Sequence, residues 1–391
     1  MSRIPSFMKS LALLTAFCAA SIASAAIEVS DWGKTSDGKE VKLYTMTNDN
    51  GMVVKISNFG AVINAIIVPD KDGNMADVAL GFDEVSGYEA DSCPYFGALV
   101  GRYGNRIADG KFTIDGKTYQ VTKNENGITC LHGGKIGFNR KIWNVETKEN
   151  DDAMILKCTL KSPNGEEGFP GNLDVIVHYI LPKKLNSLVV LYGAKTDRAT
   201  PINLTQHCYF NLKGAGADTI TDHILTINAD KFTPVNETLI PTGDLRDVEG
   251  TPFDFRKPTA IGERIGQTDY DQIKLGNGYD HNWVLNKTEN VVGKNSEKFL
   301  ETPDATLYEP TTGRVMEVYT TEPGIQFYAG NFLDGSLIGK GGKAYQFRSG
   351  MCLETQHFPN SPNTPNFPST ILRPGEEYQT GTVFRFSVKE D

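Results

Sequence analysis

The sequence has 391 residues, of which 39% are hydrophobic and 10% aromatic, and its formal net charge is −9. This is the composition of a globular protein with a large core, and length alone allows one large domain or two smaller ones. The acidic balance argues against nucleic acid, anionic membrane surfaces and phosphorylated compounds as main partners.

The first 25 residues have the layout of a secretory signal peptide. Arg3 and Lys9 precede a short apolar run, and Ala23-Ser24-Ala25 matches an A-x-A cleavage site. The run is shorter than the roughly 20 residues of a membrane-spanning helix. We therefore expect cleavage after Ala25 and a periplasmic or secreted protein. Removal of two basic residues and no acidic one makes its net charge −11. Met8 is an alternative start that gives a more compact signal of the same kind.

The mature chain is a succession of short segments rich in Val, Ile, Thr and Tyr, punctuated by many of the 39 Gly and 19 Pro. Lys111–Val121 alternates around Asp115-Gly116, which predicts a β-hairpin. Helix is expected in short connectors such as Glu84–Tyr88. The other predicted strands are Val41–Thr47, Met52–Ile56, Ala61–Pro69, Ala153–Leu160, Leu173–Leu181, Ser187–Thr196, His223–Ile227, Asn282–Leu285, Val315–Thr321, Ile325–Tyr328 and Val383–Val388.

Many short strands with turns every 8–12 residues are typical of an all-β sandwich or barrel. We find no Pro/Ser-rich linker or charge block, so residues 26–391 are predicted to form a single domain.

Five cysteines remain after removal of the signal peptide, an odd number at irregular spacing. This does not predict a disulfide framework, and we expect mostly buried free thiols with one bridge possible. No C-x-x-C or His-x-x-x-His spacing occurs, which argues against structural zinc. The five are Cys93, Cys130, Cys158, Cys208 and Cys352.

Two distant segments each place one proton-transfer group inside an otherwise apolar, strand-like run: His207 in residues 203–212 and Glu354 in residues 352–357. Histidine and glutamate have reference pKa values of about 6.5 and about 4.3, so near neutral pH one can donate a proton while the other accepts one. Such a pair suits proton transfer on a neutral substrate. The alternative is that both are satisfied polar residues of a sheet.

Other polar residues lie at strand ends and turns. Arg102 and Arg106 flank Asn105, and a guanidinium beside a carboxamide can bind sugar hydroxyls or a carboxylate, or form an internal salt bridge. His132 precedes two glycines that fit either close approach to a ligand or a plain turn. Asp280 lies beside aromatic residues, a combination used by sugar sites and by ordinary turns. His178 is expected to be a structural strand residue, and His223 to face solvent.

Taken together, these segments resemble the aldose 1-epimerase (galactose mutarotase) family. The matching pieces follow the family order over residues 30–390, almost the whole mature chain. They are Asn58–Ala61, Gly101–Ile107, Leu131–Gly134, Asn203–Leu212, Gly278–Trp283, Thr320–Phe332, Cys352–Phe358 and Leu372–Glu376.

The resemblance implies a large antiparallel β-sandwich of the supersandwich type with few short helices, and interconversion of the anomers of free aldoses such as glucose or galactose. It implies no cofactor and no metal. Glu354 would be the general base at the C1 hydroxyl and His207 the general acid at the ring oxygen. Asn105, Arg106, His132, Asp280 and Gln326 would bind hydroxyls or help to polarise the ring oxygen. Efficient turnover then requires His207 to carry a proton near neutral pH, which nearby carboxylates would favour. We expect a monosaccharide as partner and a monomer or weak homodimer.

Three alternatives remain open from the residues. A hexose-phosphate epimerase would need a basic cluster for the phosphate, which the acidic balance disfavours. A non-catalytic carbohydrate-binding module would not need His207 and Glu354 in reciprocal roles. A glycoside hydrolase would use two carboxyl groups, with Asp280 as the second, but a division of roles between His and Glu fits better.

Overall fold

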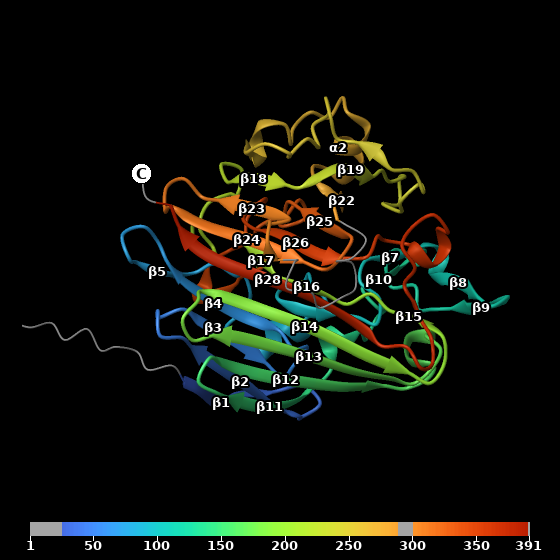
Figure 1. The fold of residues 1–391 in the computed structure, drawn as a ribbon, viewed down its shortest axis with the longest axis horizontal. Coiled ribbons are helices and arrows are strands. Elements are labelled where there is room, and N and C mark those ends of the chain that lie inside the picture. The colour runs from blue at the N-terminus through green and yellow to red at the C-terminus, as the bar shows by residue number, and fades with distance from the viewer. Residues whose placement is uncertain (1–25, 288–299, 390–391) are drawn as a thin grey trace, which may run out of the picture.

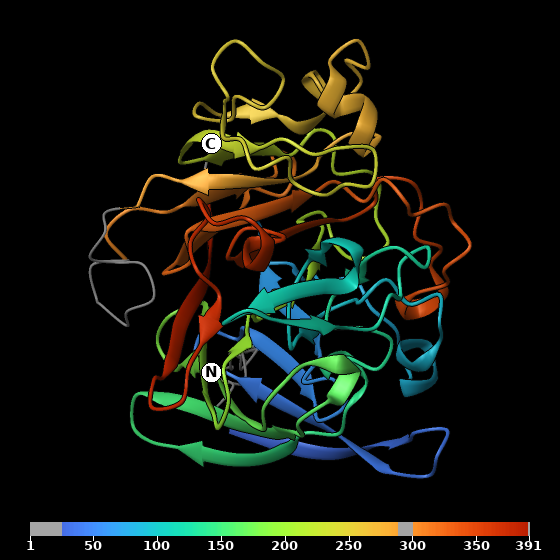
Figure 2. The same ribbon diagram turned by 90° about the vertical axis from the view of Figure 1, so that its right-hand side faces the viewer.

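Antiparallel strands make up most of the computed structural model, which describes residues 26–287 and 300–389 (Figures 1 and 2). The predicted signal peptide lies outside these residues. Within them, no helix combines the length and apolarity required to cross a membrane. The α-helices α1 (Val85–Glu89) and α2 (Asp271–Gly276) are short.

A nine-stranded sheet runs across the molecule and contains its longest strands (Figure 1). Residues of β12, β13 and β14 alternate between buried and partly exposed, as expected for strands with one face on a core. The order is β11 (Asn144–Glu149), β12 (Ala153–Ser162), β13 (Leu173–Pro182), β14 (Ser187–Thr196), β28 (Tyr378–Val388), β24 (Arg314–Thr320), β23 (Ala305–Tyr308), β18 (Ile224–Ile227) and β21 (Thr259–Ala260).

Two further sheets complete the main framework. The first is an N-terminal meander of β1 (Ala26–Lys34), β2 (Glu40–Thr47), β3 (Val53–Ser57), β4 (Ile63–Pro69) and β5 (Met75–Asp77). The second has the order β17 (Tyr209–Phe210), β26 (Met351–Gln356), β25 (Gly324–Tyr328), β22 (Asp280–Leu285), β19 (Ala229–Thr233) and β20 (Arg246–Asp247).

Short two-stranded ladders connect these sheets. They are β6 (Ala98–Val100) with β16 (Thr205–His207), β7 (Arg106–Ile107) with β10 (Cys130–Leu131), β15 (Thr200–Pro201) with β27 (Ile371–Leu372), and β8 (Lys111–Ile114) with β9 (Lys117–Gln120). The hairpin β8–β9 projects at one side of the molecule (Figure 1).

One large core joins the three main sheets. It includes Ile56 of the N-terminal sheet, Leu156 and Val177 of the nine-stranded sheet, and Trp283 and Leu353 of the six-stranded sheet. The burial of this apolar surface is the main stabilising contribution to the fold. The predicted large antiparallel β-sandwich with few short helices is therefore confirmed.

The predicted strands all occur, with bounds that differ by a few residues at most except for Val383–Val388, which is the end of the longer β28. The predicted connector helix occurs as α1. The cysteines are free thiols, partly buried at Cys93 and buried at the other four positions, so the possible bridge is absent among the described residues. The expectation for His223 is wrong: it is fully buried, and its Nε2 accepts a hydrogen bond from the Leu212 backbone amide at 3.1 Å.

Arg102 has neither of the roles that its sequence context allowed. Its guanidinium is buried and donates hydrogen bonds to the carbonyl oxygens of Pro170, Gly171 and Ser162 and to the hydroxyls of Ser162 and Thr200. Arg102 therefore links separate segments of the chain by buried hydrogen bonds, instead of binding a sugar or forming a salt bridge.

We expect Arg102→Ala to lower the free energy of unfolding by about 3 kcal/mol, because several buried acceptors lose their donor. Urea unfolding would measure the change. Arg373→Ala is the control, since Arg373 forms an exposed ion pair with Asp115 and its loss should change the free energy of unfolding far less. Equal effects of the two substitutions would contradict the structural role of Arg102.

Candidate active site

Strand register brings His207 and Glu354 together. Tyr209 of β17 lies opposite Cys352 of β26; His207 ends β16 two residues before Tyr209, and Glu354 lies two residues after Cys352. The His207 Nε2 and Glu354 Oε1 atoms are 3.6 Å apart, and both side chains are buried. Two segments about 150 positions apart in sequence thus form one acid/base pair.

The same register adds the next members of the site. Gln326 of β25 lies directly opposite Glu354, and Asp280 of β22 lies opposite Tyr328 of β25. Directly opposite residues of neighbouring strands are about 5 Å apart, so the side chains on this face of the sheet are in reach of one another. Gln326 Nε2 donates to Asp280 Oδ1 at 2.7 Å.

Arg106 enters the site from β7. Its Nη1 lies 4.0 Å from Asp280 Oδ2, while its Nε and Nη2 donate to the two carboxylate oxygens of Glu125 at 2.8–3.2 Å. Although burial acts in the opposite direction, the hydrogen bonds from Arg106 keep the pKa of Glu125 below its usual value. Glu125 thus fixes the orientation of Arg106, a role that its sequence context did not indicate.

Asn105 and His132 hold each other at the other side of the site. The backbone amide of Asn105 donates to His132 Nδ1 at 3.2 Å, and the backbone amide of His132 donates to the Asn105 carbonyl at 3.1 Å. Since Nδ1 is an acceptor, the neutral ring of His132 carries its proton on Nε2 and is a donor there.

The two glycines after His132 allow other parts of the chain to pack closely against this turn. A Cβ on Gly133 would lie 2.0 Å from the Gly101 carbonyl oxygen, and one on Gly134 would lie 2.3 Å from the Glu167 carboxylate. Both residues also have positive φ, which favours glycine. The close approach is therefore to the protein's own backbone and side chains.

All seven predicted site residues are buried, and the structure brings them into one cluster. Tyr95 is an addition that sequence reasoning missed: its ring centroid lies 4.6 Å from that of His132 and 5.7 Å from that of His207. The rings of His132 and His207 are 4.9 Å apart and nearly perpendicular. The left-handed backbone at Tyr95, φ 64°, turns its side chain toward the site, and no local pattern predicts that conformation.

Two oxygen atoms in the site have no internal partner. Within residues 26–287 and 300–389, Glu354 Oε2 and Gln326 Oε1 are buried and accept no hydrogen bond. Leaving such acceptors unpaired costs free energy, so buried polar groups are usually satisfied. Two of them side by side, next to His207, indicate a site for a ligand that donates hydroxyl hydrogen bonds.

In the free protein, burial acts against the protonated form that His207 needs during turnover. Burial lowers the pKa of His207 to about 4, opposed by its own backbone carbonyl. Burial, together with the charge of Asp280, raises the pKa of Glu354 well above its usual value, opposed by Arg106. The nearby carboxylate does not hold a proton on the imidazole because desolvation disfavours both charged forms. Burial therefore favours a neutral His207 with the shared proton on Glu354.

One ligand atom from each of His132, His207 and Glu354 lies within 4.8 Å of the others, a grouping that could suit a metal by residue type. The hydrogen bond from Asn105 argues against that use of His132. Its Nδ1 lone pair is already occupied, and its Nε2 carries the proton instead of a free lone pair.

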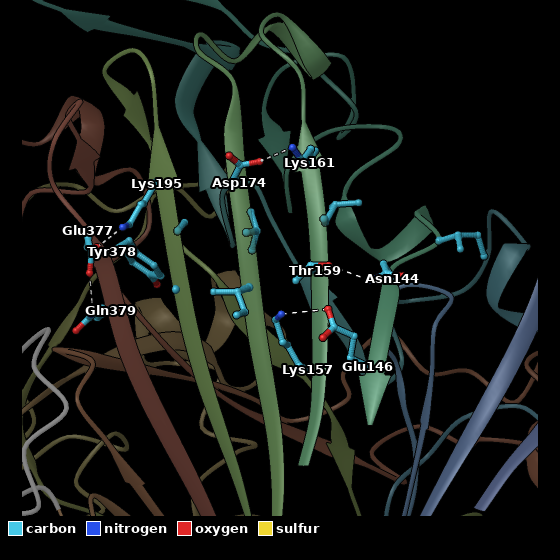
Figure 3. Close-up of a pocket in the computed structure, with 16 residues that line it drawn as sticks. Asn144, Glu146, Lys157, Thr159, Lys161, Asp174, Lys195, Glu377, Tyr378 and Gln379 are labelled. Atoms are coloured by element: carbon cyan, nitrogen blue, oxygen red, sulfur yellow. Dashed lines mark hydrogen bonds and ion pairs between the residues drawn. The ribbon is translucent and has the colours of Figure 1, made fainter. Parts of the chain in front are cut away.

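A cavity of about 700 Å³ lies away from this cluster, on the outer face of strands β11–β14 and β28 (Figure 3). Ion pairs join Lys157 with Glu146, Lys161 with Asp174, and Lys195 with Glu377 across its floor. Because these charges are mutually paired and no predicted site residue lines the cavity, it gives no indication of the chemistry.

Comparison with known proteins agrees with this geometry. Residues 42–385 match the family model described as aldose 1-epimerase. Galactose mutarotase from Bos taurus is 47% identical over 335 residues, which cover 86% of this chain and 91% of that protein. Aldose 1-epimerase from Escherichia coli strain K12 is 38% identical over 352 residues, covering 90% and 96%. The chain therefore belongs to the aldose 1-epimerase family, a family of isomerases.

Solved structures show the same fold. Galactose 1-epimerase from Lactobacillus acidophilus NCFM superposes with a TM-score of 0.80 at 27% identity, covering 94% of this chain and all of that one. An aldose epimerase homologue from C. elegans gives a TM-score of 0.78 at 28% identity, with the same coverage.

NMR titration of His207 in the free protein should give a midpoint near pH 4. The His207 contribution to stability is lost as the pH falls from about 6.5 to about 4, because in that window this residue binds a proton in the unfolded chain but not in the folded one, whereas the raised pKa of Glu354 shifts stability in the opposite direction. His178, half-buried on the outer sheet face, is the internal reference, with a smaller shift in the same direction. A midpoint at or above 6.5 for His207 would contradict the assignment of the resting proton to Glu354.

Proposed function

We propose that this protein interconverts the α and β anomers of free aldoses such as glucose and galactose by acid/base-catalysed ring opening and closure. The observation that carries the proposal is the buried imidazole–carboxylate pair 3.6 Å apart, whose Glu354 Oε2 has no partner among the described residues. Membership of the aldose 1-epimerase family supports it.

In the proposed mechanism the Glu354 carboxylate accepts the proton of the C1 hydroxyl, and the His207 imidazolium donates a proton to the ring oxygen. The C1–O5 bond breaks and C1–O1 becomes a carbonyl. Rotation about C1–C2 exposes the other carbonyl face, and the reverse proton transfers close the ring. The pair gains and loses no proton overall, so neither redox chemistry nor a phosphate group is required.

The distribution of protons that burial favours in the free site is the same as the distribution that the reaction reaches when the sugar is in its open-chain form. Ring opening leaves Glu354 protonated and His207 neutral, which is the distribution that burial favours. To open a ring, the site must first shift its proton to His207. A sugar hydroxyl that donates to Glu354 favours the carboxylate, and the charge of Arg106 acts in the same direction.

The remaining predicted residues bind the sugar in this proposal. Arg106 and the Nε2–H of His132 are donors, Asp280 and the free Gln326 Oε1 are acceptors, and Asn105 holds His132 through its backbone. This mixture suits the hydroxyls of a neutral sugar. Arg106 already faces the carboxylates of Glu125 and Asp280, which disfavours a phosphorylated substrate.

We propose that Glu354→Gln and His207→Asn each lower the rate of catalysed mutarotation by about 10²- to 10⁴-fold, the usual contribution of a general acid or base. Polarimetry of freshly dissolved α-D-glucose measures this rate, and circular dichroism checks the fold. Matched controls are Glu317→Gln and His178→Asn on the outer sheet face, which should leave the rate unchanged. A wild-type rate in either site variant would refute its role, and activity on glucose 6-phosphate but not glucose would refute the substrate class.

The expected signal peptide supports a further proposal, that the protein works in the periplasm or outside the cell. The site is built from one chain, which is compatible with action as a monomer or weak homodimer.

N-terminal sequencing of material exported by an expressing bacterium should begin at Ala26, because the A-x-A site ends at Ala25. An otherwise identical chain with Arg3 and Lys9 changed to Asp should remain inside the cell, since the basic n-region is lost. Recovery of exported protein that still begins with residues 1–25 would contradict cleavage.

A further inference from the structure

Tyr95 lies on a turn that is held by the backbone of His207. Ala98 of β6 lies opposite His207 of β16, and the Gly97 amide donates to the His207 carbonyl at 2.9 Å. The Ala98 amide donates to the Tyr95 carbonyl at 3.0 Å and closes the turn. Tyr95 itself has a φ of 64°, a left-handed conformation that bulky residues rarely adopt. Backbone strain of this kind is concentrated at functional sites, so it directs attention to what the Tyr95 side chain does.

The ring of Tyr95 is the partly exposed member of the aromatic group around His207. Two tyrosine rings contact the imidazole of His207: Tyr95 with its centroid at 5.7 Å and an interplanar angle of 35°, and Tyr209 at 5.3 Å and 30°. Tyr209 is buried, whereas Tyr95 is partly exposed. The Tyr95 ring also contacts His132 at 4.6 Å. Tyr95 therefore forms the part of the wall beside both histidines that is open to solvent.

The hydroxyl group of Tyr95 is a free hydrogen-bond donor in this wall. Across residues 26–287 and 300–389 it has no hydrogen-bond partner, and burial raises its pKa to about 12, so it stays protonated at neutral pH. By contrast, the buried hydroxyls of Tyr179 and Tyr279 donate to the carbonyls of Ala61 at 2.7 Å and Pro252 at 2.9 Å. A phenol that donates to no protein group is available to a hydroxyl of a ligand.

The surroundings of Tyr95 place it on the side of His207 that is remote from Glu354. Burial is the main cause of the raised pKa of both tyrosines next to His207. Glu354 adds to this shift for Tyr209, whereas the carboxylate that adds to it for Tyr95 is Glu125. The two rings thus face different ends of the site, and Tyr95 faces the end without the base.

The proposed reaction determines what a sugar presents at that end. The C1 hydroxyl lies at Glu354 and the ring oxygen at His207. The ring oxygen of a pyranose joins C1 to C5, so the side remote from Glu354 carries C5 and, in an aldohexose, the exocyclic C6 hydroxymethyl group. We propose that Tyr95 is a substrate-binding residue whose hydroxyl donates to the C6 hydroxyl of aldohexoses and favours them over aldopentoses, which lack this group. The proposal rests on the proposed function, because the two proton transfers orient the sugar.

The experiment compares the full mature protein with its Y95F variant, because phenylalanine keeps the ring and removes only the hydroxyl. Polarimetry of freshly dissolved sugars gives kcat and KM for D-galactose, for D-fucose, which is the same sugar without the C6 hydroxyl, and for L-arabinose, which also lacks C6. For galactose we expect Y95F to raise KM about fivefold, the value of one ordinary hydrogen bond. The kcat should stay unchanged, since this contact is the same in the ground state and the transition state.

D-fucose and L-arabinose should show no such effect, because neither sugar has a hydroxyl for Tyr95 to bind. Their KM values in Y95F should stay within about twofold of the wild-type values, less than the loss of a hydrogen bond. Y119F is the matched control: Tyr119 is also partly exposed and stacks on Phe112 in the projecting hairpin β8–β9. This variant should keep the wild-type KM for all three sugars.

An unchanged KM for galactose in Y95F, or an equal rise for galactose and D-fucose, would overturn the proposal. So would a wild-type protein with the same KM for galactose and D-fucose, a comparison that requires no variant to fold. Accelerated mutarotation in E354Q or H207N would instead refute the proposed function, and this proposal with it. Inactive E354Q and H207N beside an unaltered Y95F would leave that function standing and remove Tyr95 from substrate binding.

Discussion

The site depends on the burial of two titratable groups, His207 at the end of β16 and Glu354 in β26, two strands whose residues are all buried. Every residue of β26 is buried, with Leu353 in the main core and Glu354 on the face of the site. The backbone N–H and C=O groups of β26 form hydrogen bonds with the neighbouring strands. The strand can therefore be buried without leaving backbone groups unpaired, and its side chains are removed from water with it. Desolvation then disfavours charge on His207 and on Glu354 alike. The chemistry of the pair follows from this single condition, because desolvation disfavours the imidazolium–carboxylate form, and a sugar hydroxyl that donates to Glu354 must favour it before the ring can open.

The surrounding charges adjust that balance in opposite directions. Asp280 raises the pKa of Glu354 and Arg106 lowers it, while Glu125 fixes the guanidinium from behind. A site with a stronger cation would hold the carboxylate ionised and oppose ring closure, whereas a site without one would keep Glu354 protonated and oppose ring opening. An arginine that is shared between two carboxylates favours ionised Glu354 to an intermediate degree. A reversible reaction whose two end states have nearly equal free energies requires such a balance.

The fold was predictable because its signals are local. Alternation of apolar and polar residues gave β14 with its observed bounds, and an Asp-Gly turn gave the hairpin β8–β9. The site residues were accessible through short family segments, and the strand register explains why they meet. The failures concern burial and long-range contact. His223 opens a strand as expected but is covered by distant chain, and the partners of Arg102 lie about 60 to 100 positions away in sequence. The direction of the His207 pKa shift in the free protein could not be predicted for the same reason, since desolvation by the whole fold outweighs a neighbouring carboxylate.

The ring centroids of His132 and His207 are 4.9 Å apart. The group next to the Nδ1 atom of each ring determines which of the two histidines can exchange protons. His132 accepts from the Asn105 backbone amide, a donor that cannot reverse. A second proton on that ring would place two N–H groups head to head, so His132 remains a neutral donor at Nε2. The neighbour of His207 Nδ1 is instead the Cys352 sulfur at 3.6 Å, and its Nε2 faces Glu354. A ring whose Nδ1 is not committed to accepting from a backbone N–H can carry a second proton, so the roles of the two histidines follow from the group at each Nδ1.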